Sequence, residues 1–331
     1  MYLSRLKEKT VLVTGATGLI GKNLIRTLLE ANSGAADKIR VIASVRNLER
    51  AQEIFTNYLC DELEFLVGDI CNISPQNLKV DYIVHGASQT SSKAFVNEPV
   101  ETIMTALNGT KNLLEFARLN TVKGFVYLSS MEVYGSPTTD EKINEHNSTD
   151  INTMSVRSCY PESKRMCETL CSSYEYEYGV PIKVLRLTQT FGPGVHYNDG
   201  RVFAEFARCA IEGRDIVLNT KGETKRNYLY TDDAVAAILT VLLDGKRGEA
   251  YNAANEDTYC SIYEMACLVA EKCSDNYIRV IVDEKDDTSR YGYAPTLQMN
   301  LDTAKLRNLG WKQSVGLIDM YKRMIRDMTK I

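Results

Sequence analysis

The stretch from Thr10 to Asn32 most constrains the fold of this chain. It reads TVLVTGATGLIGKNLIRTLLEAN, an apolar run followed by Gly15, Gly18 and Gly21 and then by apolar residues at helical spacing. This order predicts a strand, a tight turn and a helix. Because glycine lets backbone N–H groups approach a pyrophosphate at a helix N-terminus, the stretch favours a dinucleotide site. An ordinary glycine-bearing loop is the alternative interpretation.

Strands and helices alternate through the first 192 residues. The expected strands are 39–46, 63–70, 80–88, 123–130 and 182–192, and the expected helices are 48–58, 97–118 and 161–178. This alternation predicts an α/β fold with a doubly wound parallel sheet that binds its ligand at the carboxyl ends of the strands. We predict a nucleotide-binding domain over 1–192, with a return segment at about 231–258. A smaller mixed α/β domain covers 193–230 and 259–331, and the polar stretch 136–158 is expected to be a surface loop near the site.

Composition narrows the class of protein. The 331 residues are 44% hydrophobic and 25% charged, with a net charge of −4, so no charge surplus favours nucleic acid or an anionic membrane as a partner. The apolar run at 234–243 is too short to span a bilayer, and the N-terminus lacks a signal-peptide pattern. We expect a cytoplasmic protein.

Cysteine and histidine are poorly placed to bind a metal. The nine cysteines never form Cys-x-x-Cys, and only three histidines are present, so we predict neither a metal site nor a disulfide. Cys167 and Cys171 share a helical face and are interpreted as small buried apolar residues.

Three strand ends carry candidate cofactor contacts. The second strand ends in Arg46 and Asn47 without an acidic residue. A guanidinium there suits a 2′-phosphate and favours NADP over NAD, unless Arg46 is simply an exposed arginine. Asp69 follows the third strand, where it is placed to bind an adenine amino group, and the small residues 86–88 follow the fourth.

The most informative set of reactive residues is Ser129-Ser130, at the end of the fifth strand, together with Tyr160 and Lys164. Tyrosine and lysine at i and i+4 share one helical face, so the ammonium can stabilise a phenolate. A phenol that acts as a base near pH 7 needs its pKa lowered by about three units, or about 4 kcal/mol. Ser130 would then bind the substrate oxygen. The alternative is an ordinary surface pair.

Five motifs in order resemble the extended short-chain dehydrogenase/reductases, and within them the nucleotide-sugar epimerase/dehydratase group: TGATGLIG, NGTKNLLEFA, LSSMEVYG, YPESK and TKRNYLYTDD. The resemblance implies a Rossmann domain, a C-terminal domain that binds a nucleoside diphosphate sugar, and hydride transfer to NAD or NADP through a transient keto sugar. It also implies a homodimer formed by helices 97–118 and 161–178, although their apolar faces could pack entirely within one chain.

The resemblance assigns residues to three roles. The catalytic residues would be Ser130, Tyr160, Lys164 and Glu132. The cofactor would contact Gly15, Thr17, Gly18, Leu19, Ile20, Gly21, Arg46, Asn47, Asp69, Ile70, Ala87, Ser88, Asn108, Tyr160 and Lys164. The sugar nucleotide would contact Gln89, Ser130, Met131, Gln189, Arg201, Arg226 and Arg290, with Arg226 and Arg290 on the diphosphate.

Three departures from the family pattern separate the possible reactions. Met131 stands where family 4,6-dehydratases carry the aspartate that protonates the leaving hydroxyl and where fucose-type enzymes carry cysteine, and methionine has no proton to donate. Glu132 is either a base or a structural carboxylate, and Gln189 replaces a common asparagine. The sequence therefore favours a C4 epimerase. An NADPH-dependent keto-sugar reductase is the alternative, ahead of a dehydratase and of a non-catalytic dinucleotide-binding protein.

Overall fold

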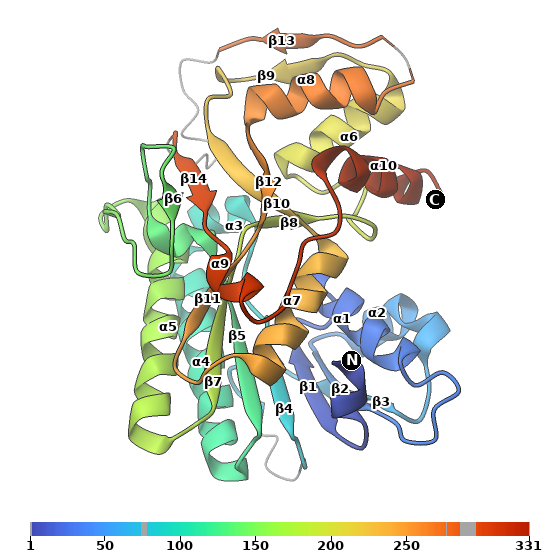
Figure 1. The fold of residues 1–331 in the computed structure, drawn as a ribbon, viewed down its shortest axis with the longest axis vertical. Helices are drawn as coiled ribbons and strands as arrows, with labels where there is room; N and C mark the ends of the chain where they lie inside the picture. Colours follow the sequence, from blue (N-terminus) through green and yellow to red (C-terminus); the bar gives the residue numbers. More distant parts are fainter. Residues whose placement is uncertain (1, 74–77, 276, 285–295, 331) are drawn as a thin grey trace.

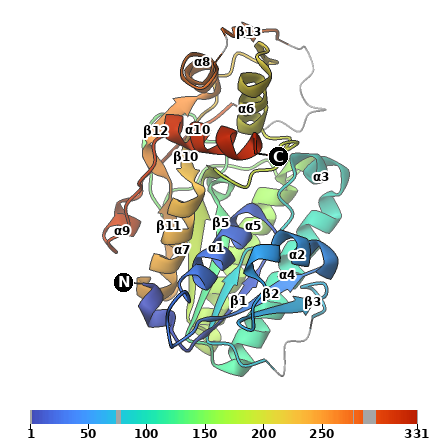
Figure 2. The same ribbon diagram turned by 90° about the vertical axis from the view of Figure 1, so that its right-hand side faces the viewer.

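The computed structural model describes residues 2–73, 78–275, 277–284 and 296–330. Two lobes are stacked along the long axis, with the N-terminus in the lower lobe and the C-terminus in the upper one (Figures 1 and 2). The lower lobe is built on a seven-stranded sheet in the order β3-β2-β1-β4-β5-β7-β11, with every pair parallel. This confirms the predicted doubly wound fold. Its strands are β1 (Thr10–Thr14), β2 (Arg40–Val45), β3 (Leu63–Val67), β4 (Tyr82–His85), β5 (Gly124–Ser130), β7 (Ile182–Leu187) and β11 (Ala250–Ala253).

Helices cover both faces of this sheet because successive strand residues point to opposite sides. Val11 and Val13 join one core cluster with the first and seventh helices, whereas Leu12 joins another with the fourth and fifth. The larger helices of this lobe are α1 (Leu19–Glu30), α4 (Pro99–Asn120), α5 (Cys159–Tyr178) and α7 (Thr231–Asp244). Shorter helical segments are η1 (Leu3–Leu6), α2 (Leu48–Ile54), η2 (Thr56–Tyr58), α3 (Ser92–Asn97), η3 (Met131–Tyr134) and η4 (Val156–Ser158).

The upper lobe holds two small sheets with helices packed against them. One has the order β12-β10-β14-β6, with β8 also paired to β10, and the other joins β13 and β9. The strands are β6 (Lys142–Ile143), β8 (Gln189–Phe191), β9 (Ile216–Leu218), β10 (Lys225–Tyr230), β12 (Asn255–Ser261), β13 (Val280–Val282) and β14 (Gln298–Leu301). The helices are α6 (Val202–Glu212), α8 (Ile262–Lys272) and α10 (Leu317–Met328), whereas the short α9 (Ala304–Arg307) packs against β11 of the lower lobe.

Two elements differ from the sequence-based expectations. The predicted strand over 182–192 breaks at Thr188, so that β7 stays in the large sheet while β8 pairs with β10 in the upper lobe. The expected surface loop 136–158 contains β6, which pairs with β14, and ends in η4. Both differences arise because pairing partners distant in the sequence decide which sheet a short run joins. The domain boundaries themselves stay predictions.

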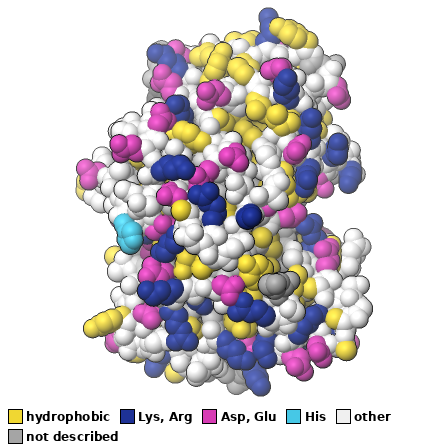
Figure 3. Space-filling view, viewed as in Figure 1, with side chains coloured by type: hydrophobic (Ala, Val, Ile, Leu, Met, Phe, Trp, Pro, Cys, Tyr) yellow, Lys and Arg dark blue, Asp and Glu magenta, His cyan; other side chains and the backbone are white. Residues whose placement is uncertain are grey.

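The surface in Figure 3 mixes basic and acidic side chains over both lobes, in keeping with a net charge of −4. Over the part of the chain that the structure describes, no helix combines the length and the apolar character needed to cross a membrane.

Candidate functional site

The carboxyl ends of the parallel strands bring most of the predicted residues to one edge of the large sheet. The strand order reverses between β1 and β4, and in folds of this type ligands bind outside such a reversal. The backbones after these two strands touch, since a Cβ on Gly15 would lie 2.7 Å from the Gly86 oxygen. The site is therefore centred on the glycine turn that first marked the sequence.

The geometry of this turn fits a pyrophosphate. Gly15 has φ of +68°, a conformation that favours glycine, and a Cβ on Gly21 would lie 2.2 Å from the Gly15 oxygen. The first intrahelical hydrogen bond of α1 runs from Lys22 N to Gly18 O, so the N–H groups of Leu19 to Gly21 point out of the helix N-terminus. Thr17 lies half-buried in the same turn. These groups would hold the diphosphate of a dinucleotide.

The adenosine side of the predicted site is open to solvent. Arg46 is exposed directly after β2, and Asn47 caps α2 by accepting a hydrogen bond from Arg50 N at 2.9 Å. Asp69 is exposed after β3, and its Oδ1 accepts a bond from Cys71 N at 2.8 Å. Asp69 therefore uses one carboxylate oxygen to hold its own turn, and its predicted contact with adenine stays a prediction.

The remaining predicted cofactor contacts differ in exposure. Ile70 is buried, and its side chain packs so closely on α4 that a Cβ on Gly109 would lie 2.8 Å from it. The side chain of Ile70 is therefore part of the core beside the site. Asn108 is exposed on α4, and Ala87 and Ser88 are half-buried after β4. The amide oxygen of Gln89 accepts bonds from Thr90 N and Ser91 N at the start of α3, which commits that oxygen to its own turn.

Tyr160 and Lys164 lie in the first two turns of α5, which packs against β5. Tyr160 is 8% exposed, and the side chain of Ser130 lowers the phenol's pKa. Successive side chains of β5 point to opposite faces of the sheet, so Ser129 points away from Ser130. Ser129 donates a hydrogen bond to Glu168, further along α5, at 2.5 Å. Lys164 is buried and donates to Leu128 O at 2.9 Å.

The titration of these two groups differs from the simplest expectation. Burial raises the pKa of Tyr160 above its ordinary value, and the Glu132 carboxylate raises it further, while Arg157 and Arg201 lower it. Burial lowers the pKa of Lys164 to about 8, and its Nζ lies 6.0 Å from the centroid of the Tyr160 ring. Lys164 thus shares the helical face with Tyr160 as predicted, but its ammonium is bonded to a backbone carbonyl.

Two residues beside Tyr160 escaped the sequence analysis. Phe95 of α3 stacks on the Tyr160 ring at 4.4 Å between centroids, and the Arg157 guanidinium lies 4.8 Å from the Phe95 ring. Arg157 also pairs with Glu132 at 2.8 Å, and its Nε is buried without a hydrogen-bond partner among the described residues. The position of Arg157, three residues before Tyr160, was the available signal. Glu132 is thereby held as one half of an ion pair.

The upper lobe contributes two predicted arginines. Arg226 of β10 donates to Gln189 Oε1 of β8 at 3.0 Å, which joins two of the predicted substrate contacts. Arg201 is held by Asp199 through Nε at 2.9 Å and Nη2 at 2.6 Å. Arg290 lies outside the described residues.

Met131 occupies a core position at the junction of the lobes. It is 6% exposed among apolar residues of β14 and η3, and its sulfur lies 3.2 Å from Thr188 Oγ1, which donates its proton to Asn227 O at 2.6 Å. Its side chain therefore belongs to an apolar wall, and its direct contact with substrate stays a prediction.

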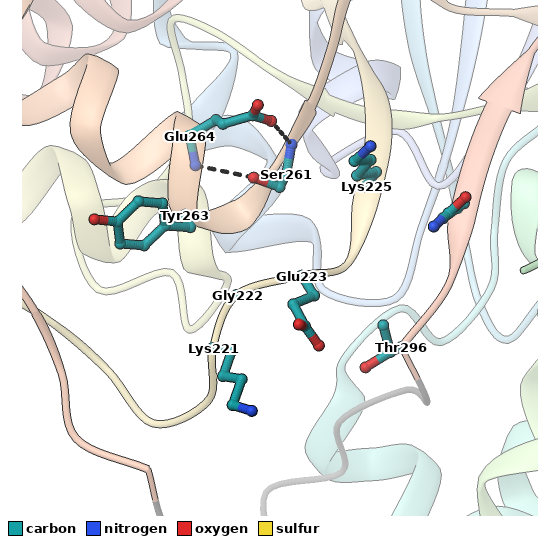
Figure 4. Close-up of a pocket in the computed structure, with 9 residues that line it drawn as sticks. Lys221, Gly222, Glu223, Lys225, Ser261, Tyr263, Glu264 and Thr296 are labelled. Atoms are coloured by element: carbon teal, nitrogen blue, oxygen red, sulfur yellow. Dashed lines mark hydrogen bonds between the residues drawn. The ribbon is translucent and has the colours of Figure 1, made fainter. Parts of the chain in front are cut away.

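A separate pocket of about 540 Å³ lies in the upper lobe (Figure 4). Lys221, Glu223 and Lys225 contribute both signs of charge to it, while Ser261 and Glu264 are engaged in a reciprocal cap at the start of α8. Lys225 and Arg226 are consecutive on β10 and so face opposite sides, which separates this pocket from the Arg226 side of the strand. Within the described ranges, no group of three or more His, Cys, Asp or Glu side chains is arranged to bind a metal.

Comparisons with known proteins match almost the whole chain. A model of the NAD dependent epimerase/dehydratase family matches residues 11–254. UDP-glucuronic acid decarboxylase 1 of Xenopus tropicalis is 29% identical over 333 residues, covering 99% of this chain and 74% of the relative. A solved epimerase structure from Methanothermobacter thermautotrophicus has a TM-score of 0.83 at 25% identity, covering 99% of this chain and 94% of that one. The dTDP-glucose 4,6-dehydratase of Streptomyces venezuelae, solved with NAD and TYD bound, has a TM-score of 0.79 at 25% identity and covers 97% of both chains.

Proposed function

This chain belongs to the NAD dependent epimerase/dehydratase family of enzymes, and we propose that it is a nucleotide-sugar epimerase that acts at C4 through a transient keto sugar. The family match confirms the resemblance of the sequence motifs. The similar proteins carry out epimerisation, dehydration and decarboxylation, so the reaction has to be argued from the site.

The proposal depends on three side chains where the end of β5 meets the start of α5, namely Ser130, Tyr160 and Lys164. A bound dinucleotide would supply the hydride acceptor, held by the glycine turn and the α1 N-terminus. Ser130 would orient the sugar hydroxyl, and Tyr160 would take its proton and return it. The buried phenol keeps its proton at neutral pH, so added positive charge is needed before it acts as a base.

Met131 carries the choice of epimerisation over dehydration. Dehydration needs an acid that protonates the leaving hydroxyl, and the buried thioether of Met131 has no proton to give. Epimerisation needs only the hydroxyl proton and the hydride to move and return. The two predicted arginines, Arg201 and Arg226, are suited to the diphosphate of the substrate.

One observation favours a second candidate, an NADPH-dependent keto-sugar reductase. Arg46 is exposed at the end of β2, where a 2′-phosphate would lie, and neither of the two residues after the strand, Arg46 and Asn47, is acidic. A reductase uses the same three groups but consumes its cofactor, whereas an epimerase recycles it. The similarity to UDP-glucuronic acid decarboxylase makes uronic acid substrates a necessary part of any assay.

The test combines cofactor release with product analysis. Denatured protein is examined by mass spectrometry for bound dinucleotide, and UDP-glucose, UDP-glucuronic acid and dTDP-glucose are then followed by NMR. Retained NAD+ together with a change at C4 supports the epimerase. Stoichiometric NADPH oxidation with a keto sugar supports the reductase, and release of CO2 or loss of water contradicts both.

A Tyr160→Phe variant checks the assigned role in the same assays. The loss of the phenol should lower kcat at least about 100-fold, as removal of a general acid–base group does, while dinucleotide binding persists. Tyr176→Phe is the matched control, because Tyr176 lies on the same helix but is 92% exposed. A Tyr160→Phe enzyme with near-normal turnover would remove Tyr160 from the mechanism.

A further inference from the structure

A buried chain of four side chains crosses the lower lobe behind the glycine turn. Thr14 Oγ1 of β1 lies 2.7 Å from His85 Nδ1 of β4, and His85 Nε2 lies 3.1 Å from Thr110 Oγ1 of α4. Thr110 in turn donates to Cys167 Sγ of α5 at 3.3 Å. None of the four residues is more than 1% exposed. These four side chains therefore link the last residue of β1, directly before Gly15, to the helix that carries Tyr160 and Lys164.

The upper end of the chain fixes one direction of hydrogen bonding. Thr14 Oγ1 accepts a bond from Ala87 N at 3.1 Å, and at 3.2 Å it shares the Gly86 N–H with the carbonyl oxygen of Thr14, which lies 3.2 Å from the same nitrogen. A hydroxyl oxygen has two acceptor lone pairs and one proton, so these two bonds leave only the proton of Thr14 for His85. His85 Nδ1 must then be an acceptor, and the ring proton must lie on Nε2.

The hydrogen bonds at the Cys167 end agree with this tautomer. Cys167 donates its thiol proton to Ala106 O at 3.3 Å, so the sulfur can accept the proton of Thr110. Thr110 Oγ1, having used its proton, must accept from His85 Nε2. Both ends therefore agree on the Nε2–H tautomer.

We propose that His85, held as the neutral Nε2–H tautomer, is a positioning residue that fixes the backbone N–H groups of Gly86 and Ala87 beside the dinucleotide. The inference rests on the proposed dinucleotide site, because the two loops that it fixes are those after β1 and β4. It adds a function to residues that the sequence motifs did not single out.

The charge state of the ring agrees with this role. Burial lowers the pKa of His85 to about 3, and the nearby Lys164 ammonium lowers it further. A protonated ring would carry a hydrogen on both nitrogens, and Nδ1–H would then face the proton of Thr14. The imidazole packs against the rings of Phe125 and Tyr127, with centroids 6.3 Å and 5.6 Å away.

Nitrogen-15 NMR of the imidazoles tests the tautomer directly in the full chain. Only three histidines are present, and the exposed His146 and His196 can be assigned by His146→Gln and His196→Gln. We expect His85 to show an acceptor Nδ1 and a protonated Nε2 unchanged between pH 5 and 8. An Nδ1–H tautomer or an imidazolium in that range would overturn the proposal without any measurement of activity.

The positioning role is tested by paired substitutions at Thr14. Thr14→Val keeps the shape but removes the acceptor, so we expect NADH or NADPH affinity to fall about tenfold and the single tautomer to be lost. Thr14→Ser restores the hydroxyl and should restore both. Unchanged affinity in a folded Thr14→Val variant would overturn the role. Wild-type protein that binds neither dinucleotide would overturn the proposed function, while the tautomer still decides the hydrogen-bond chain.

Discussion

Gly21 shows how little space the dinucleotide turn leaves at the level of single atoms. Its missing Cβ would lie 2.2 Å from a backbone oxygen, which cannot move without shifting Gly15. Gly21→Ala should therefore displace the turn, and backbone strain of about 1–3 kcal/mol corresponds to a roughly 5- to 150-fold loss of dinucleotide affinity. The measurement is NADH binding by fluorescence.

Gly316→Ala is the control for this substitution. A Cβ at Gly316 has nothing within 4 Å, and its φ is −78°, so the added methyl group is tolerated by the native backbone. Equal loss of affinity in both variants would show that the close packing at Gly21 is not what matters.

Lys164 predicts an alkaline limit for dinucleotide binding. Its pKa is lowered by burial from 10.5 to about 8, so the folded protein loses this charge as pH rises through about 8. We expect affinity to fall above that pH and the decline to disappear in Lys164→Arg, since arginine stays charged. Between pH 8 and 10.5 the unfolded chain keeps the proton that the folded chain has released, so the contribution of Lys164 to stability rises with pH.

A second lysine distinguishes this explanation from a general effect of pH. Burial also lowers the pKa of Lys183 to about 8, but Lys183 bonds Leu242 O. Lys183→Met should leave the alkaline decline in affinity intact. If the alkaline decline in affinity disappeared in Lys183→Met, the decline would be due to Lys183 and not to Lys164.

At the scale of elements, α7 ties the C-terminal segment to the rest of the fold. The buried Asp233 accepts bonds from Ser314 N, Ser314 Oγ and Val315 N, which hold the chain just before α10. Asp233→Ala would leave these buried donors unpaired and should lower the free energy of unfolding by about 3 kcal/mol. Urea unfolding provides the measurement.

The neighbouring Asp232 offers a matched control. It is half exposed and pairs with Arg26 at 3.2 Å, an arrangement that contributes about 0.5 kcal/mol. If Asp232→Ala and Asp233→Ala lowered the free energy of unfolding equally, the bonds from Asp233 to Ser314 and Val315 would not be what stabilises the segment before α10.

What the sequence could predict follows from the range of the interactions involved. The glycine turn and the Tyr160–Lys164 pair are set by spacings within a single turn or helix, and both occur where they were expected. The break at Thr188 is invisible locally, because LRLTQTF contains no Gly, Pro, Asn or Asp to mark a turn and only the partner strand β10 divides it. Phe95 reaches Tyr160 from α3, so only packing reveals it, whereas Arg157 stands three residues before Tyr160 in the sequence and contacts Phe95 and Glu132.

The whole molecule presents exposed apolar side chains on the two packed helices α4 and α5. Val100 is 71% exposed, Met104 44% and Met166 51%. Such a surface favours a second copy of the chain as its cover, as expected from the resemblance. We expect a homodimer in solution, and Met104→Glu combined with Met166→Glu should shift it to a monomer in sedimentation velocity.

Tyr277→Glu is the control for the assembly, because Tyr277 is 92% exposed in the upper lobe, away from α4 and α5. It should leave the mass unchanged. A wild-type protein that sediments as a monomer at micromolar concentration would contradict the expected dimer.

The single residues that separate β7 from β8 and β11 from β12 bear on any attempt to exchange parts between related enzymes. Thr188 and Ala254 are both buried, and at each the backbone passes from one sheet directly into the other. A chimera cut after residue 192 would take β8 from one parent and β10, its pairing partner, from the other. Transferring substrate preference between relatives therefore requires moving paired strands together. A contiguous C-terminal half would pair its β10 with a β8 from the other parent.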